Sequence, residues 1–104
     1  AVCSCITLTA GLNGANVITI EGVSKNGELD EIQQAILDHH ALQCGFCTPG
    51  IVMSAKALLD RNPNPTTQEI QEAIAGNLCR CTGYQQVIDA IEDAAVRRAE
   101  QELL

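Results

Sequence analysis

Apolar residues recur every three or four positions along most of the chain after residue 28, which is the spacing of one buried face on an α-helix. This stripe predicts a first helix from Glu28 to near Leu42. A second helix is predicted to begin at Thr48, with Thr48 as its cap and Pro49 at its first position. The Asn-Pro-Asn-Pro segment at 62–65 should end it.

Two further helices follow in the same half of the chain. The third opens with Thr66 and Glu69, which have the spacing of a capping box, and should stop near Gly76. The fourth begins near Tyr84 and again carries apolar residues at helical spacing. The charged segment 97–104 is expected to fray or to contact a partner.

The start of the chain has a different pattern. Residues 5–9 alternate apolar and polar side chains, and residues 17–20 are β-branched throughout. The Gly and Asn residues between these segments predict a β-hairpin with a loose loop. Two strands alone are marginally stable in water, so this hairpin needs a further sheet or a covering partner.

The chain thus divides into a hairpin over residues 1–24 and a helical domain over residues 25–104. The helical part contains two similar units, each made of a helix, a pair of cysteines, a threonine and a second helix. We predict a mainly α fold: a four-helix bundle of two helical hairpins related by an approximate two-fold axis. Both cysteine loops would then meet at one end of the bundle.

Composition narrows the possible functions. The 104 residues carry a net charge of −7, which disfavours nucleic acid and anionic membrane surfaces as partners. Phe46 and Tyr84 are the only aromatic residues, so stacking surfaces are almost absent. The sequence has no apolar run long enough for a membrane span and no recognisable signal peptide, so we expect a cytoplasmic protein.

The six cysteines are the unusual part of this composition. Cys44 and Cys47 have C-x2-C spacing, and Cys79 and Cys81 have C-x-C spacing, with 31 residues between the two pairs. Neighbouring C-x-C cysteines bridge each other poorly, and the helical periodicity argues against a secreted disulfide scaffold. Four thiolates at one end of a bundle suit either tetrahedral zinc or an iron–sulfur cluster.

Three observations favour a 2Fe-2S cluster over zinc. The sulfurs of a C-x-C pair tend to diverge, which suits two irons better than one ion. Each pair precedes a predicted helix N-terminus, whose free N–H groups and partial positive charge favour thiolates and an anionic cluster. Neither residues 39–59 nor residues 73–88 contain Asp or Glu. A zinc-stabilised structural or interaction module stays the alternative, and a regulatory thiol protein is a third interpretation.

Two segments, QCGFCTPG at 43–50 and GNLCRCTGY at 76–84, resemble the signatures of the iron–sulfur small subunit of molybdenum hydroxylases. That family includes xanthine dehydrogenase, aldehyde oxidoreductase and the small subunit of aerobic carbon monoxide dehydrogenase. The resemblance covers roughly residues 4–95. It implies that four residues hold the 2Fe-2S cluster nearest the molybdenum centre: Cys44, Cys47, Cys79 and Cys81.

The resemblance also implies the partners of this chain. Gln43 and the loop around Cys81 would approach the pterin of the molybdenum cofactor, which a large subunit binds. Electrons released by substrate hydroxylation would pass through the cluster toward a second cluster and then to FAD on a flavoprotein subunit. The chain would therefore be the electron-transfer subunit of an oxidoreductase and would perform no substrate chemistry itself.

The N-terminal region departs from the family pattern. Family members carry a ferredoxin-like half with a C-x4-C-x2-C motif before a fourth cysteine ligand. The first three ligands are absent here and the fourth is present as Cys5, so the chain is expected to lack most of that half. Cys5 is then a possible lone ligand of a second 2Fe-2S cluster, whereas Cys3 matches no family ligand.

The remaining candidates have structural interpretations. His39 and His40 are expected at the polar end of the first helix rather than as metal ligands. Phe46 is expected to shield the cluster from water, and Tyr84 to lie in the core with its hydroxyl hydrogen-bonded. Arg80 lies between two ligands, where it either offsets the cluster's charge or faces solvent.

Overall fold

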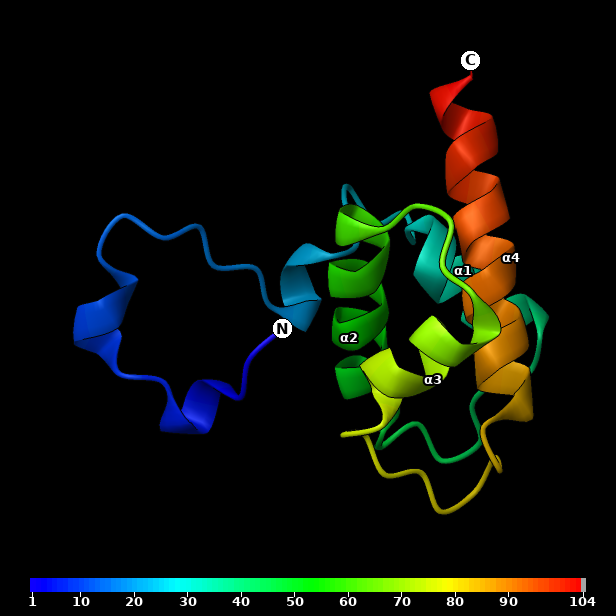
Figure 1. The fold of residues 1–104 in the computed structure, drawn as a ribbon, viewed down its shortest axis with the longest axis horizontal. Helices are drawn as coiled ribbons and strands as arrows, with labels where there is room; N and C mark the ends of the chain where they lie inside the picture. The colour runs from blue at the N-terminus through cyan, green and yellow to red at the C-terminus, as the bar shows by residue number, and fades with distance from the viewer. Residues whose placement is uncertain (104) are drawn as a thin grey trace.

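The computed structural model describes residues 1–103, which contain four α-helices. Figure 1 shows these helices gathered in one bundle, with the first part of the chain projecting to one side as an open loop. The helices are α1 (Glu31–Asp38), α2 (Thr48–Arg61), α3 (Thr67–Ile74) and α4 (Gln85–Glu102). The predicted mainly helical fold is confirmed.

A single apolar core lies between the four helices. Ile32 of α1, Ile51 of α2, Ile70 of α3 and Ile91 of α4 are each at most 2% exposed. Burying an aliphatic side chain of this size contributes about 1.5–3 kcal/mol. Helix α1 packs on α4, and α2 packs on α3. The apolar stripes that predicted the helices are therefore the faces that meet in the core.

Helix α1 is shorter at both ends than its periodicity predicts. Asp30 caps its N-terminus, because Asp30 Oδ1 accepts a hydrogen bond from the Gln33 N–H at 2.8 Å and Gln33 Oε1 accepts one from the Asp30 N–H at 3.1 Å. The helix ends at Asp38, before the predicted Leu42, since His40 has a left-handed φ of 52° that reverses the chain.

The predicted N-terminal caps of α3 and α2 can be compared with the structure. Thr66 and Glu69 form the capping box predicted for α3. Thr48, by contrast, is the first residue of α2 and not its cap, so that prediction is wrong. Cys47 holds the cap position, and its φ of −81° and ψ of −15° are already right-handed. The chain thus turns into the helix one residue earlier than expected.

The end of α4 remains helical, although fraying was one of the two expectations for it. Arg97 Nη2 lies 2.8 Å from Asp38 Oδ2 of α1, and Arg98 Nη1 lies 2.8 Å from Asp60 Oδ1 of α2. These ion pairs hold the last turns of α4 against two other helices. The final residue of the sequence, which belonged to the same prediction, lies outside the described residues.

The β-hairpin predicted for residues 1–24 is not formed, and residues 1–103 contain no strand. Three short 3₁₀ helices stand there instead: η1 (Ser4–Ile6), η2 (Thr9–Leu12) and η3 (Ile20–Gly22). Ile6 and Leu8 are 81% and 80% exposed. Among the described residues no strand lies beside this segment to complete a ladder, and an isolated hairpin is only marginally stable.

The chain joins the bundle at η3, which contacts α2. Val23, directly after it, is 4% exposed and belongs to the core. Within the described part of the chain, no helix combines the length and the apolar character needed to cross a bilayer.

Candidate metal centre

The two cysteine loops lie at the same end of the bundle. One loop joins α1 to α2 and the other joins α3 to α4, and Figure 1 shows both below the helices. Cys44 is in the first loop and Cys47 caps α2, while Cys79 and Cys81 are in the second loop. The predicted meeting of both loops at one end of the bundle is confirmed.

The four sulfurs are arranged as two pairs. Cys81 Sγ lies 3.7 Å from Cys44 Sγ, and the thiols of Cys47 and Cys79 are close enough for each to shift the pKa of the other. Each pair therefore contains one cysteine from each loop. Two sulfurs on one tetrahedral metal ion lie about 3.8 Å apart when the metal–sulfur bonds are about 2.3 Å. The separation of Cys44 and Cys81 matches that value.

This arrangement suits two metal ions better than one. A structural zinc ion needs four ligands around one centre, whereas a 2Fe-2S cluster takes two cysteines on each iron. The donor set of two separate thiol pairs fits the binuclear cluster.

The charge state of the cysteines is uneven. The Thr82 hydroxyl donates a hydrogen bond to Cys79 Sγ at 3.1 Å, and this bond is the largest cause that lowers the pKa of Cys79 to about 7. Burial, followed by the neighbouring Cys79, raises the pKa of Cys47. The hydrogen bond with Cys44 raises the pKa of Cys81. Since metal ligands must be deprotonated, the hydrogen bond from Thr82 favours the form of Cys79 that binds metal.

Tyr84 holds the second loop in place by hydrogen bonds to its backbone. Its hydroxyl oxygen accepts a hydrogen bond from the Cys79 N–H at 2.7 Å, and its O–H donates one to the Asn77 carbonyl at 3.0 Å. Its φ of 74° and the φ of 69° at Gly83 are left-handed, so the chain reverses just before α4. The ring packs against the core. The predicted hydrogen bonding of the hydroxyl is confirmed, whereas the ring is half-buried against the core and does not lie within it.

A further contact ties the second loop to α2. Asn77 Nδ2 donates to Ser54 Oγ at 2.9 Å. Gly50, in the first turn of α2, leaves room for this amide, because a Cβ there would lie 2.5 Å from Asn77 Oδ1. Sequence reasoning missed these three residues. The available signal was a glycine inside a predicted helix, where glycine is unfavourable without a packing reason.

Gln43 links the two loops at the surface. Its Nε2 donates to the Cys81 carbonyl at 3.1 Å. The two residues for which the resemblance implies contact with a pterin are therefore neighbours, and both are exposed.

Several other candidates lie outside the centre. Cys3 and Cys5 are exposed in the N-terminal segment. His39 Nε2 lies 2.8 Å from Asp93 Oδ2, so it ties the end of α1 to α4 as a structural residue. Arg80 is exposed in the loop. Phe46 is 93% exposed, so the prediction that it shields the site from water is wrong for this chain.

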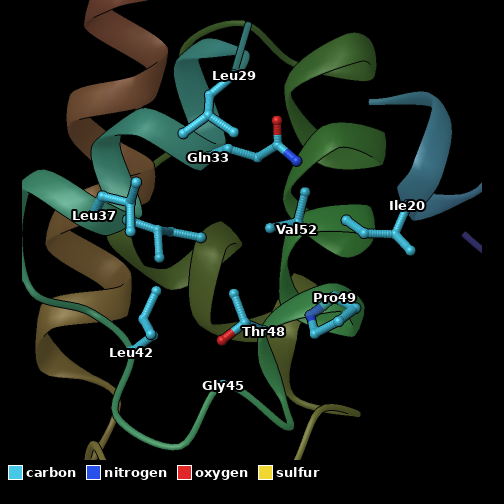
Figure 2. A pocket seen from close by; sticks show the side chains of 10 residues that line it. Ile20, Leu29, Gln33, Leu37, Leu42, Gly45, Thr48, Pro49 and Val52 are labelled. Atoms are coloured by element: carbon cyan, nitrogen blue, oxygen red, sulfur yellow. The ribbon is translucent and has the colours of Figure 1, made fainter. Parts of the chain in front are cut away.

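A separate apolar pocket of about 340 Å³ opens between α1 and α2. Figure 2 shows Leu37 and Leu42 on one side of it, Val52 and Pro49 on the other, and Gly45 at its lower edge. No cysteine lines it. The pocket is therefore distinct from the metal centre.

A helical bundle that brings paired thiols together at one end has the donor set of a binuclear iron–sulfur domain. The chain belongs to the 2Fe-2S binding domain family, which matches residues 19–92. The resemblance drawn from the two cysteine motifs is thereby confirmed.

The relatives have descriptions consistent with that family. The chain is 54% identical over 94 residues to the nicotine 6-hydroxylase small subunit of Paenarthrobacter nicotinovorans, covering 90% of this chain and 56% of that protein. It is 47% identical over 98 residues to the nicotinate dehydrogenase small FeS subunit of Eubacterium barkeri, covering 94% of this chain and 62% of the relative.

The fold is also found in a solved structure. A chain of quinoline 2-oxidoreductase from Pseudomonas putida 86 matches with a TM-score of 0.83 and 46% identity. The match covers 95% of this chain and 61% of that one. The chain thus spans about 60% of the length of these relatives.

Proposed function

We propose that this chain carries one 2Fe-2S cluster and transfers electrons as the iron–sulfur part of a molybdenum hydroxylase. Cys44, Cys47, Cys79 and Cys81 are the proposed ligands. The observation that carries this proposal is the arrangement of the sulfurs in two pairs, with one member of each pair from each loop. Such a cluster accepts and releases one electron at a time.

The protein's own residues prepare this site in three ways. Gln43 holds the two loops together, and Tyr84 fixes the backbone of the second loop. Thr82 supplies a hydrogen bond to a ligand sulfur. Acidic side chains, which would oppose the addition of negative charge, make none of these contacts.

We propose that a molybdenum-binding large subunit covers the cysteine end of the bundle. Phe46 and Leu78 stand in the two loops and are 93% and 87% exposed, a pair of apolar side chains suited to burial in an interface. Gln43 and Cys81 are exposed on the same loops and would approach the pterin. The names of the relatives, a "small subunit" and a "small FeS subunit", agree with a larger partner. FAD would belong to a flavoprotein subunit.

Residues 1–24 are proposed to belong to a ferredoxin-like domain, and residues 25–104 to form the helical 2Fe-2S domain. The exposed apolar residues of the N-terminal segment support this division, since a sheet beside them would both bury them and complete the hairpin. Cys5 would be a ligand of a second cluster, with the other ligands supplied from outside this chain.

We also propose that the bundle is two helical hairpins related by an approximate two-fold axis. Each unit has a short helix with a capping box, a cysteine loop and a longer helix. The contact of α1 with α4 corresponds under that symmetry to the contact of α3 with α2.

A cytoplasmic location is part of the proposal. Four cysteines that act as metal ligands must stay reduced, which favours a reducing compartment. All six cysteines are free thiols in the structure.

The direct test is a visible absorption spectrum with iron and acid-labile sulfide analysis of the anaerobically purified chain. A red-brown protein with about two irons and two sulfides per chain is expected. A colourless protein with one zinc ion per chain would instead establish the zinc-stabilised module.

A further inference from the structure

The second cysteine loop contains a short chain of hydrogen bonds that ends on a ligand sulfur. The Tyr84 N–H donates to Thr82 Oγ1 at 3.2 Å, and the Thr82 hydroxyl is 3.1 Å from Cys79 Sγ. Because the amide proton occupies a lone pair of the hydroxyl oxygen, the hydroxyl's own hydrogen is left for the sulfur. The direction of the Thr82 donor is thus set by the backbone of Tyr84.

Both ends of this chain are fixed. The Tyr84 hydroxyl accepts the Cys79 N–H at 2.7 Å, which ties the backbone of the sulfur-bearing residue to the same tyrosine. The tyrosine itself is anchored at the Asn77 carbonyl and against the core. Thr82 is therefore held between two parts of one rigid unit and does not turn freely, as an exposed hydroxyl would.

The first loop offers a natural comparison. Thr48 directly follows Cys47, as Thr82 directly follows Cys81. Thr48 is in the first turn of α2, and within the described part of the chain its hydroxyl makes no hydrogen bond to a cysteine sulfur. The donor to sulfur is therefore particular to the second loop.

We propose that Thr82 raises the reduction potential of the centre by donating its hydroxyl hydrogen to Cys79 Sγ, with Tyr84 as the positioning residue for that hydroxyl. This inference rests on the proposed 2Fe-2S site. One-electron reduction adds negative charge that spreads onto the ligand sulfurs, and a hydrogen bond to sulfur stabilises the more negative state more strongly. Loss of the donor lowers the potential.

The test is an EPR-monitored redox titration of the anaerobically purified chain, with dithionite as the one-electron reductant. Thr82→Val keeps the shape of the side chain and removes the donor. At a fixed potential, its ratio of reduced to oxidised cluster should fall by up to about tenfold, which corresponds to 59 mV for a one-electron couple. Thr82→Ser keeps the hydroxyl, so its reduction potential should stay close to that of the unmodified chain.

Thr48→Val is the matched control, because it makes the same change beside a cysteine whose sulfur receives no hydroxyl. Its potential should equal that of the unmodified chain. The inference is overturned if Thr82→Val leaves the potential unchanged, or if Thr48→Val or Thr82→Ser lowers it equally.

The EPR signal reports on loaded clusters, so partial loading of a variant does not disturb the result. If Thr82→Val holds no iron, Thr82→Ala removes the same donor without adding bulk and decides the question. If the unmodified chain binds no iron, the proposed function itself is contradicted. If it binds a cluster whose potential does not depend on Thr82, this inference alone is contradicted.

Discussion

Gly50 and Asn77 fit together so closely that a Cβ at residue 50 would lie 2.5 Å from Asn77 Oδ1. The Asn77 amide cannot easily turn away, because it donates to Ser54 Oγ at 2.9 Å. The contact holds the loop that carries Cys79 against the first turn of α2, close to Cys47. The spacing of the two cysteine loops is therefore set in part by the absence of a side chain at residue 50.

Gly50→Ala should destabilise the protein for this reason. Overpacking of a close contact costs about 1–3 kcal/mol, and the gain of about 0.5–1 kcal/mol from replacing a helical glycine offsets part of it. Unfolding in urea at neutral pH measures the difference. The loss of unfolding free energy caused by Asn77→Ala should be smaller in the Gly50→Ala chain than in the unmodified chain. Equal costs in both backgrounds would contradict the contact.

Cys79→Ser should remove the metal. A change in an outer hydrogen bond alone costs roughly 10–100-fold in metal affinity, and loss of a ligand should cost more. Iron and sulfide analysis with the visible spectrum measures this effect. Cys3→Ser is the control, since Cys3 is exposed in the N-terminal segment. A Cys79→Ser chain with full iron and an unchanged spectrum would remove Cys79 from the ligand set.

Gln43→Ala should leave the cluster in place and weaken its coupling to the molybdenum partner. The variant loses the hydrogen bond from Gln43 Nε2 to the Cys81 carbonyl. A loss of about 1.4 kcal/mol would slow the reduction of the cluster by substrate roughly tenfold. Stopped-flow absorbance of the assembled complex follows that reduction. An equal rate in the variant would show that Gln43 has no part in the coupling.

The contact between α1 and α4 should give stability that depends on pH. Burial raises the pKa of Asp93, but hydrogen bonds from His39 and Arg97 outweigh it and hold the pKa below its usual value. A carboxyl with a lowered pKa stabilises the fold fully above its unfolded pKa of about 3.9, and this contribution is lost as the pH falls through the folded value.

Asp93→Asn should therefore cost at most about 1 kcal/mol at pH 7 and flatten the decline of stability below about pH 4. Urea unfolding at several pH values measures both effects. Asp89→Asn is the control on the same helix, where the carboxylate accepts a hydrogen bond from Gln85 at 2.9 Å. If the stability of Asp93→Asn falls as steeply with pH as that of the unmodified chain, Asp93 is not the source of the pH dependence.

The helices could be predicted because their stability comes from local periodicity and a shared core. The stripes that contain Ile51 and Ile91 are visible in the sequence and are buried in the structure. The capping box at Thr66 is equally local. The start of α1 lies at Glu31 and not at Glu28, because the Asp30–Gln33 capping box, which has the same spacing, sets it there.

Other features depend on distant parts of the chain and were missed or wrong. The segments 5–9 and 17–20 have residues suited to strands, but within residues 1–103 no strand lies beside them to make a ladder. The contact of Asn77 with Ser54 joins residues in different units, and no spacing rule relates them. Phe46 was expected to cover the site, but its loop directs it into solvent.

The pairing of the sulfurs has one further consequence. Cys44 and Cys47 come before the connection at 62–65, and Cys79 and Cys81 come after it. Each neighbouring pair of sulfurs, such as that of Cys44 and Cys81, therefore takes one cysteine from each half of the chain. A loaded centre would join the halves as a disulfide joins two segments, although a chelator rather than a reductant would open it. A chain cut by a protease at 62–65 would keep that cross-link until its metal was withdrawn.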